Sequence, residues 1–273
     1  MASILLPSNA INWGQPVNRS SPLNRGLVSW WLGNGPTVNS GSWKDIAGNN
    51  TGTLTNGAAW ATVSGRQSGV SSVAFDGSND YVALGSLSAL VFPYQISFWQ
   101  KPTTLSQNGI WISVGSPTDK IALGIYNTGN IILVGTIAAQ FGLSGVSTYF
   151  TAGVWRHVSV TCTNSSTTLK MYIDGVEKTL SNMGDLYTAV SDNIGARNNG
   201  ATYPFSGNID DVRIHNRALS ANEVYQVYVD SLTGYQRTLN RLTRTFAYSS
   251  GAAGAVYNPF TGGINPLQGF IAA

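Results

Sequence analysis

The chain has 273 residues, which is enough for one large domain or two small ones. Hydrophobic residues make up 42% of it, so a core can form, whereas charged residues make up 10%, well below the roughly 25% of an average globular domain. The net charge of +3 argues against a protein dedicated to nucleic acid or to a membrane surface. The single cysteine, Cys162, excludes an intrachain disulfide, and the abundant glycine is typical of an all-β protein with many turns.

Residues 1–25 are polar and contain three prolines, which predicts an extended N-terminal arm. This segment has no basic start followed by a long apolar run, so it does not resemble a signal peptide. The chain also has no run of about 18 apolar residues that predicts a membrane span. We therefore expect synthesis in a cytoplasm, without a signal peptide, and no membrane partner.

Short alternating segments separated by turn residues predict β-strands from residue 27 to residue 215. Residues 27–32 are apolar on both faces, so we expect both faces of this strand to be covered. The other expected strands follow at a spacing typical of a two-sheet sandwich, and they are residues 73–75, 81–84, 95–100, 110–114, 121–126, 131–136, 154–162, 169–173, 176–180 and 209–215. Asp174 and Gly175 predict a tight hairpin, because both tolerate the positive φ angles of a type I′ turn.

Helical signals begin only towards the C-terminal end. Ser220 and Glu223 form a capping-box pattern, which predicts the start of a helix. Residues 235–246 carry an apolar stripe with three arginines on the opposite side, which predicts a small amphipathic helix. Its basic face is either solvated or in contact with an acidic partner. The expected organisation is an arm over 1–25, a sandwich over 26–230, and a helix with a second extended arm over 231–273.

Six segments carry a family resemblance, and they are residues 26–32, 73–82, 94–99, 155–160, 171–176 and 205–220. In this order and spacing they resemble the laminin-G-like jelly rolls of the concanavalin A-like lectin/glucanase superfamily, over about residues 26–230. The last segment, which precedes the capped helix, is the most specific. The opening residues 12–31 are also similar to laminin-G-like proteins encoded by tailed bacteriophages.

The resemblance implies an all-β fold, a two-sheet antiparallel jelly-roll sandwich with a short C-terminal helical segment and extended terminal arms. Such a sandwich needs many short alternating strands with turn-rich links, which the sequence supplies. The fold alone does not determine the function.

The residues argue against an enzyme. Glycosidases need two carboxylates at a defined separation, but Glu177 stands beside the expected hairpin turn and Glu223 in the capping box. His157 and His215 lie on expected strands, and no Gly-x-Ser-x-Gly motif accompanies them. Nucleotide-binding glycine motifs are also absent from the sequence. We therefore predict a non-catalytic protein with no cofactor other than a candidate calcium ion.

The resemblance implies a calcium site, because laminin-G-like relatives often hold this ion at the rim of the sandwich. Asp76, Asn79 and Asp80 supply hard oxygen ligands within one turn, and Asp210 or the adjacent Asp211 is a further candidate ligand. The alternative is that Asp76 and Asn79 form an Asx-type turn without a metal.

Carbohydrate binding needs aromatic platforms beside hydrogen-bonding side chains. Trp99, Trp111, Tyr126 and Trp155 are the candidates, and the alternative is that these aromatic side chains belong to the core or to an interface.

Two functions from different classes follow. The first is a structural bacteriophage virion protein, capsid-decorating or tail-associated, exposed on the particle and docked by its arms to other virion subunits and to itself. The expected docking residues are Arg237, Arg241, Arg244, Tyr257, Phe260 and Phe270. The second is a lectin-like adhesion module that binds host-surface polysaccharide.

Overall fold

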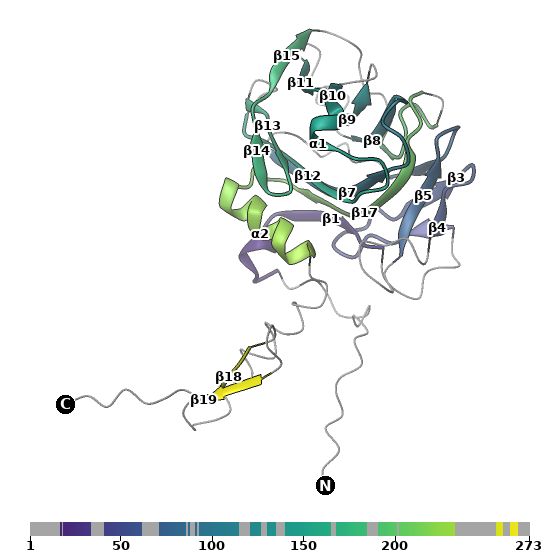
Figure 1. Ribbon diagram of the computed structural model, residues 1–273. Helices are drawn as coiled ribbons and strands as arrows, with labels where there is room; N and C mark the ends of the chain where they lie inside the picture. The colour runs from purple at the N-terminus through teal and green to yellow at the C-terminus, as the bar shows by residue number, and fades with distance from the viewer. Residues whose placement is uncertain are drawn as a thin grey trace, which may run out of the picture. The chain divides into compact units, whose positions relative to one another are not determined.

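A computed structural model gives the structure of the protein (Figure 1). It describes residues 17, 19–33, 41–61, 71–85, 87, 91, 93–114, 121–126, 130–134, 140–164, 168–184, 191–200, 202–232, 255–258 and 263–266. The chain divides into two compact units, Met1–Leu232 and Thr233–Ala273. Within the described part of the chain, no helix has the length and apolar character needed to cross a membrane.

The first sheet of the larger unit has eight antiparallel strands in the described residues. Its order is β14–β13–β12–β7–β17–β5–β4, and β1 also pairs with β17. The bounds are β1 Leu27–Trp31, β4 Ala59–Ala61, β5 Ser72–Asp76, β7 Tyr94–Pro102, β12 Arg156–Cys162, β13 Lys170–Ile173, β14 Val176–Lys178 and β17 Ser206–His215.

The second sheet has nine antiparallel strands in the same described residues, in the order β15–β11–β10–β9–β8–β16–β6–β3–β2. The bounds are β2 Ser42–Trp43, β3 Gly52–Thr55, β6 Tyr81–Ala83, β8 Gly109–Val114, β9 Ile121–Tyr126, β10 Asn130–Val134, β11 Gln140–Ser144, β15 Ser181–Gly184 and β16 Asn193–Ile194. Figure 1 shows the two sheets stacked as layers, which confirms the predicted two-sheet sandwich and is consistent with a jelly roll.

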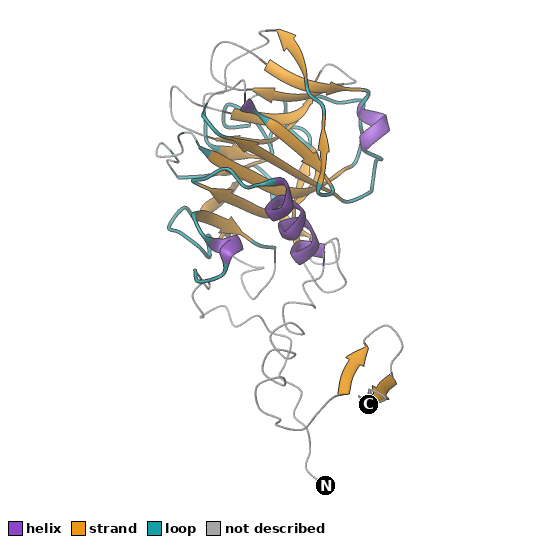
Figure 2. Cartoon of the chain, turned by 90° about the vertical axis from the view of Figure 1, so that its left-hand side faces the viewer, coloured by secondary structure: helices purple, strands orange, loops and turns teal. Residues whose placement is uncertain are grey.

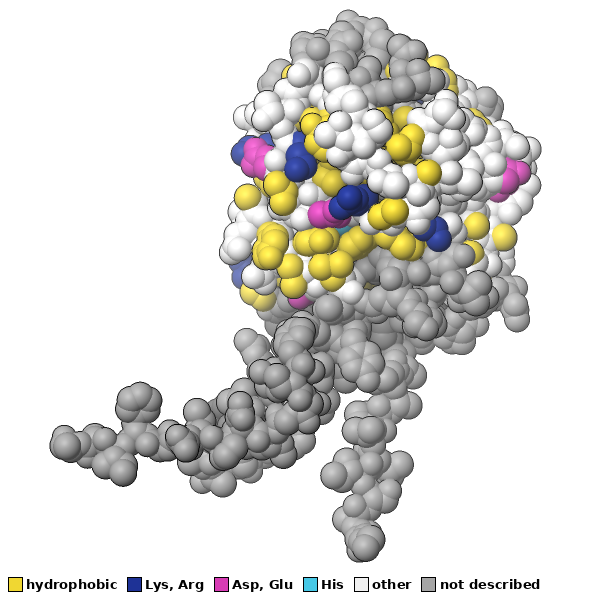
Figure 3. Space-filling view, viewed as in Figure 1, with side chains coloured by type: hydrophobic (Ala, Val, Ile, Leu, Met, Phe, Trp, Pro, Cys, Tyr) yellow, Lys and Arg dark blue, Asp and Glu magenta, His cyan; other side chains and the backbone are white. Residues whose placement is uncertain are grey.

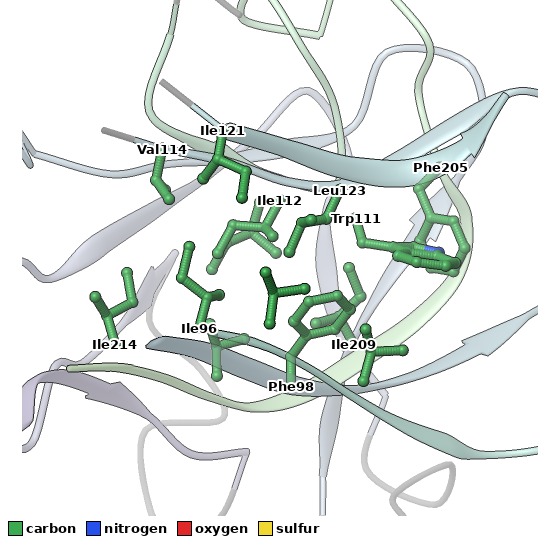
Figure 4. Close-up of a cluster of buried hydrophobic side chains, with 14 of the residues drawn as sticks. Ile96, Phe98, Trp111, Ile112, Val114, Ile121, Leu123, Phe205, Ile209 and Ile214 are labelled. Atoms are coloured by element: carbon green, nitrogen blue, oxygen red, sulfur yellow. The ribbon is translucent and has the colours of Figure 1, made fainter. Parts of the chain in front are cut away.

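The core lies between the sheets because side chains alternate along each strand. Ile96 and Phe98 of β7 point inwards and meet Trp111 and Val114 of β8 (Figure 4). Phe98 and Trp111 have ring centroids 5.7 Å apart. Full burial of one large apolar side chain contributes about 1.5–3 kcal/mol, so this layer is the main source of stability.

The predicted hairpin at Asp174 and Gly175 is confirmed. These residues connect β13 to β14 and have φ angles of 51° and 76°. Both angles lie in the left-handed region that a type I′ turn needs. The turn sets the register in which Ile173 pairs with Val176.

One long helix, α2 (Ala221–Leu232), covers the outer face of the first sheet (Figure 2). The predicted capping box is present: Glu223 Oε2 accepts from Ser220 N at 2.9 Å, and Ser220 Oγ accepts from Glu223 N at 3.4 Å. Val224 and Val227 are buried in a small second core with Tyr172 of β13. This core fixes the helix on the sheet.

The end of the predicted N-terminal arm packs on the sandwich. Pro22–Asn24 forms a short 3-10 helix, η1, and Leu23 joins the small core under α2. Leu23 O lies 2.9 Å from His215 Nε2, and Arg217 Nη2 donates to Pro22 O at 3.1 Å. Residues 22–24 therefore belong structurally with the sandwich.

Several short elements are not among those that the sequence predicts. They include β2, β3, β4, β16 and the four-residue helix α1 (Val146–Tyr149). Segments of two to four residues are too short to show a periodicity, so tertiary pairing decides their conformation. In the C-terminal unit, the predicted helix over 235–246 lies outside the described residues, and β18 (Ala255–Asn258) pairs with β19 (Gly263–Pro266).

Candidate functional site

Three loops meet at one end of the sandwich, which we call the rim. They are the turn after β5 (residues 76–80), the loop between β7 and β8 (103–108), and the loop between β16 and β17 (195–205). Gln107 joins them, because its Nε2 donates to Gly77 O at 2.7 Å and to Pro204 O at 3.4 Å. The loops therefore form one connected surface.

The loop over residues 195–205 has an unusual backbone. Positive φ angles occur at Gly195 (88°), Asn198 (53°), Asn199 (53°), Gly200 (81°) and Tyr203 (50°). A bulky aromatic residue with positive φ costs about 1–3 kcal/mol and persists only when its surroundings hold it.

Backbone hydrogen bonds hold Tyr203 in this conformation. Arg197 and Thr202 exchange two bonds, of 3.0 and 3.2 Å, which close the loop on itself. Tyr203 O accepts from Ile110 N at 2.9 Å, which ties the loop to β8. The fold therefore stabilises a strained position that presents one aromatic ring.

The ring of Tyr203 lies against Tyr126, the last residue of β9. Their ring centroids are 5.2 Å apart and the rings are nearly perpendicular, at 85°. Both side chains are half-buried and pack on Ile110 and Ala122. A hydrogen bond to Tyr126, and then burial, raise the pKa of Tyr203, whereas the charge of Arg197 lowers it. The two phenols and the guanidinium therefore lie within electrostatic reach of each other.

Polar side chains of the same loop add hydrogen-bonding capacity. Asn198 Nδ2 donates to Thr202 Oγ1 at 3.3 Å, while Asn198 Oδ1 has no partner within the described part of the chain. Asn199 is exposed beside it. Aromatic faces beside amide and hydroxyl groups are suited to a polar, ring-shaped ligand.

Tyr126 is a residue that the sequence predicts as a sugar platform, whereas no sequence pattern predicts Tyr203, Arg197 or Gln107. The one signal in this region is the turn dipeptide Asn199-Gly200, which marks a loop without indicating what the loop presents. Contacts between distant loops carry no periodicity in the sequence.

The candidate calcium ligands divide into two places. Asp76, Asn79 and Asp80 share the turn after β5, where Asp80 Oδ2 accepts from Asp76 N at 2.8 Å and Asp76 Oδ1 accepts from Ser78 N at 2.7 Å. Asp80 is 2% exposed, and its Oδ1 has no partner within the described residues. Burial, and then the nearby charge of Asp76, raise the pKa of Asp80. An orphaned buried carboxylate oxygen beside a second carboxylate fits a hard cation.

Asp210 lies apart from that group. Its Oδ1 accepts from Gly33 N at 2.7 Å and from Asp211 N at 2.6 Å. In the ladder between β5 and β17, Asp76 pairs with Ser206, four residues before Asp210. Within the described residues, no three His, Cys, Asp or Glu side chains gather as a metal site would require.

Two predicted sugar platforms are wrong, because both side chains are buried. Trp111 is fully buried in the core. Trp99 is 4% exposed beneath α2, where it stacks on Tyr228 at 5.8 Å and donates from Nε1 to Ser231 Oγ at 2.8 Å. Trp155 is partly exposed, and Lys101 Nζ lies 5.3 Å from the centre of its ring.

The predicted docking residues fall in the C-terminal unit. Tyr257 lies on β18. The others lie outside the described residues, and they are Arg237, Arg241, Arg244, Phe260 and Phe270.

The two glutamates occupy ion pairs. Glu177 Oε1 lies 3.1 Å from Lys170 Nζ on the surface, and Glu223 Oε1 lies 2.7 Å from Arg217 Nη2. The hydrogen bond from Arg217 lowers the pKa of Glu223 to about 2. Glu223 therefore lacks the raised pKa that a general acid needs.

The sequence matches one family model, that of the concanavalin A-like lectin/glucanases superfamily, over residues 76–225. No curated protein matches the chain.

Solved structures share the fold at low sequence identity. Domain 4 of AbnA, an extracellular arabinanase from Geobacillus stearothermophilus in complex with arabinotriose, is 23% identical with a TM-score of 0.52, and the match covers 74% of this chain and 98% of that one. Trypanosoma rangeli sialidase in complex with sialic acid is 14% identical (TM-score 0.54), with 77% of this chain and 33% of that one covered. The receptor binding domain of botulinum neurotoxin D is 17% identical (TM-score 0.56), with 77% and 54% covered. The chain therefore spans about a third of the sialidase and about half of the neurotoxin domain.

Proposed function

We propose that this chain, which belongs to the concanavalin A-like lectin/glucanases superfamily, is a non-catalytic module that binds carbohydrate at Tyr126 and Tyr203. The observation that carries the proposal is the strained backbone of Tyr203, with φ of 50°, which holds its ring against Tyr126 at the rim. Strained residues cluster at ligand sites because the strain fixes a geometry that function needs.

Two of the similar structures support a sugar ligand, because they were solved in complex with arabinotriose and with sialic acid. The chemistry of the rim agrees with such a ligand. Tyr126 and Tyr203 supply apolar ring surface for the C–H face of a sugar, and Asn198 and Arg197 supply donors and acceptors for hydroxyl groups.

A screen of the full chain against a broad glycan array tests the proposal. We expect binding to at least one glycan class, and a loss of about tenfold in affinity for Tyr203→Ala and for Tyr126→Ala, which corresponds to about 1.4 kcal/mol. Tyr203→Phe keeps the ring and removes the hydroxyl group, so its loss should be smaller.

Tyr225→Ala is the matched control, because Tyr225 lies on α2 and is 50% exposed. Figure 3 shows hydrophobic side chains gathered in a band on one face of the molecule. A glycan array without hits, or an equal loss in the control, would overturn the proposal. Release of sugar from the bound polysaccharide would overturn its non-catalytic part.

We also propose that the protein is a bacteriophage virion component, capsid-decorating or tail-associated, that displays this module on the particle. The supporting observation is the separate C-terminal unit, whose described part is a two-stranded sheet. An isolated two-stranded sheet is at best marginally stable in water, so this unit favours attachment to another chain. Mass spectrometry of purified particles tests the proposal, and absence of the protein from them would overturn it.

A further inference from the structure

The C-terminal hairpin has unpaired strand edges. β18 and β19 pair from Ala255 opposite Pro266 to Asn258 opposite Gly263, and within the described residues each strand has one partner. The outer edge of each strand therefore presents backbone N–H and C=O groups that a further strand can pair with. Because two strands alone are marginally stable, a third strand would stabilise the unit.

The two edges are not equivalent. β19 ends in Pro266, which has no backbone N–H and interrupts a ladder of hydrogen bonds. β18 is Ala-Val-Tyr-Asn and keeps every donor and acceptor. Proline is typical of strand edges that remain unpaired, so the edge of β18 is the better one for an incoming strand.

The surrounding sequence offers nothing that repels an identical strand. From Thr245 to Ala273 the chain contains no Asp, Glu, Lys, Arg or His. Natural proteins protect edge strands from self-pairing with charged side chains, above all lysine. The lack of charge also gives a charged partner nothing to recognise, which favours a second copy of the same segment.

We propose that β18 pairs antiparallel with β18 of a second copy, so that two hairpins form a four-stranded sheet about a twofold axis. Such an interface is isologous, because the same residues contribute from both chains. The proposal deepens the assembly role suggested above and does not depend on the rim site. The dimer also joins two sandwiches in one assembly, which would increase avidity for a repeating glycan.

The mass of the full chain in solution tests the dimer. Light scattering after size-exclusion chromatography should give twice the 28.9 kDa of one chain. Val256→Lys places like charges across the twofold axis and should give a monomer with an unchanged melting temperature of the sandwich. Gln268→Lys adds the same charge outside the hairpin and should remain dimeric. A monomeric wild-type chain, or dissociation by both substitutions, would overturn the proposal.

Disulfide trapping tests the strand pairing itself. Cys162 is buried, so a cysteine introduced into β18 adds a second thiol at a known position in the sequence. Tyr257→Cys should form a covalent dimer under mild oxidation faster than Gln268→Cys. Equal rates would place the contact elsewhere and overturn the pairing of β18. Monomeric Val256→Lys should keep its affinity for a monovalent sugar, so failure of the dimer and failure of the rim site are separable.

Discussion

Asp211 and Arg213 form a buried ion pair on the outer face of β17. Arg213 Nε donates to Asp211 Oδ1 at 2.8 Å and Arg213 Nη2 donates to Asp211 Oδ2 at 2.9 Å, with side-chain exposures of 4% for Arg213 and 2% for Asp211. Trp30 completes the group: its Nε1 donates to Asp211 Oδ1 at 2.6 Å, and the guanidinium lies 4.4 Å from its ring centre. The pair thus connects β1 to β17, an interior strand of the sheet.

Removing one partner should strongly destabilise the sandwich. Arg213→Met leaves the Asp211 carboxylate buried without its cation, so we expect the free energy of unfolding to fall by about 3–5 kcal/mol. The control is Lys170→Met, which removes an exposed pair with Glu177 and should cost less than about 1 kcal/mol. Urea denaturation measures both, and similar losses in the two variants would contradict the prediction.

Gly195 shows how tightly the rim loop fits the core. Its φ is 88°, and a Cβ atom there would lie 2.1 Å from Cε1 of Phe75. Gly195→Ala should therefore lower the free energy of unfolding by about 2 kcal/mol or more, through strain and a clash with a core ring. Gly41 has nothing within 4 Å of a Cβ and no positive φ, so Gly41→Ala should be close to neutral. Thermal unfolding of the two variants makes the comparison.

The sequence was sufficient to predict the layers. In β7, Ile96 and Phe98 alternate with Ser97 and Trp99, and the structure buries the first pair between the sheets. Alternation predicts this because it depends on a period of two within one strand. The capping box at Ser220 was equally readable, because its contacts are local.

The errors have physical causes that single-strand patterns cannot show. The register of β8 shifts between Ile110 and Ile112, and this bulge helps to direct Trp111 into the core. Trp99 does face away from the core, as alternation predicts, but α2 covers it. Tyr203 lies in the candidate site because of a strained loop, and its partner Tyr126 is distant in the sequence.

His215 should make stability depend on pH. Its ring lies between Gln95 Oε1 at 2.6 Å and Leu23 O at 2.9 Å, on a strand that also carries Arg213. Burial, together with the charges of Arg213 and Arg217, lowers the pKa of His215 to about 4, against the opposing effects of the hydrogen bond to Leu23 O and the charge of Glu223. The fold therefore favours the neutral ring.

The sign follows from a folded-state pKa below the unfolded value of 6.5. The part of the free energy of unfolding that depends on a neutral His215 is complete above pH 6.5 and is lost as the pH falls towards 4. The free energy of unfolding then falls by at most about 1.4 kcal/mol per pH unit. Urea denaturation between pH 7 and 4 should show this slope in the wild type and lose it in His215→Gln. Glu223 has a pKa of about 2 in the folded protein against its usual 4.5, so its own contribution to stability is lost mainly below about pH 4.5, in the wild type and in the variant alike. An identical slope in the variant would rule out His215 as the cause.

Substitution of Asp80 tests whether calcium binds at the rim. A cation beside its orphaned Oδ1 would neutralise a buried carboxylate, so calcium should raise the melting temperature of the full chain and a chelator should reverse the shift. Asp80→Asn should abolish this response, while Asp230→Asn on α2, which removes the same charge, should retain it.

The raised pKa of Asp80 also predicts how stability depends on this residue when no metal is bound. Because the fold disfavours the ionised form, stability from this group increases as the pH falls through the raised pKa towards 3.8. In chelator at pH 7, Asp80→Asn should therefore be at least as stable as the wild type. A melting transition that calcium leaves unchanged would instead assign Asp76 and Asn79 to a simple Asx-type turn, with Asp80 closing it through the bond to Asp76 N.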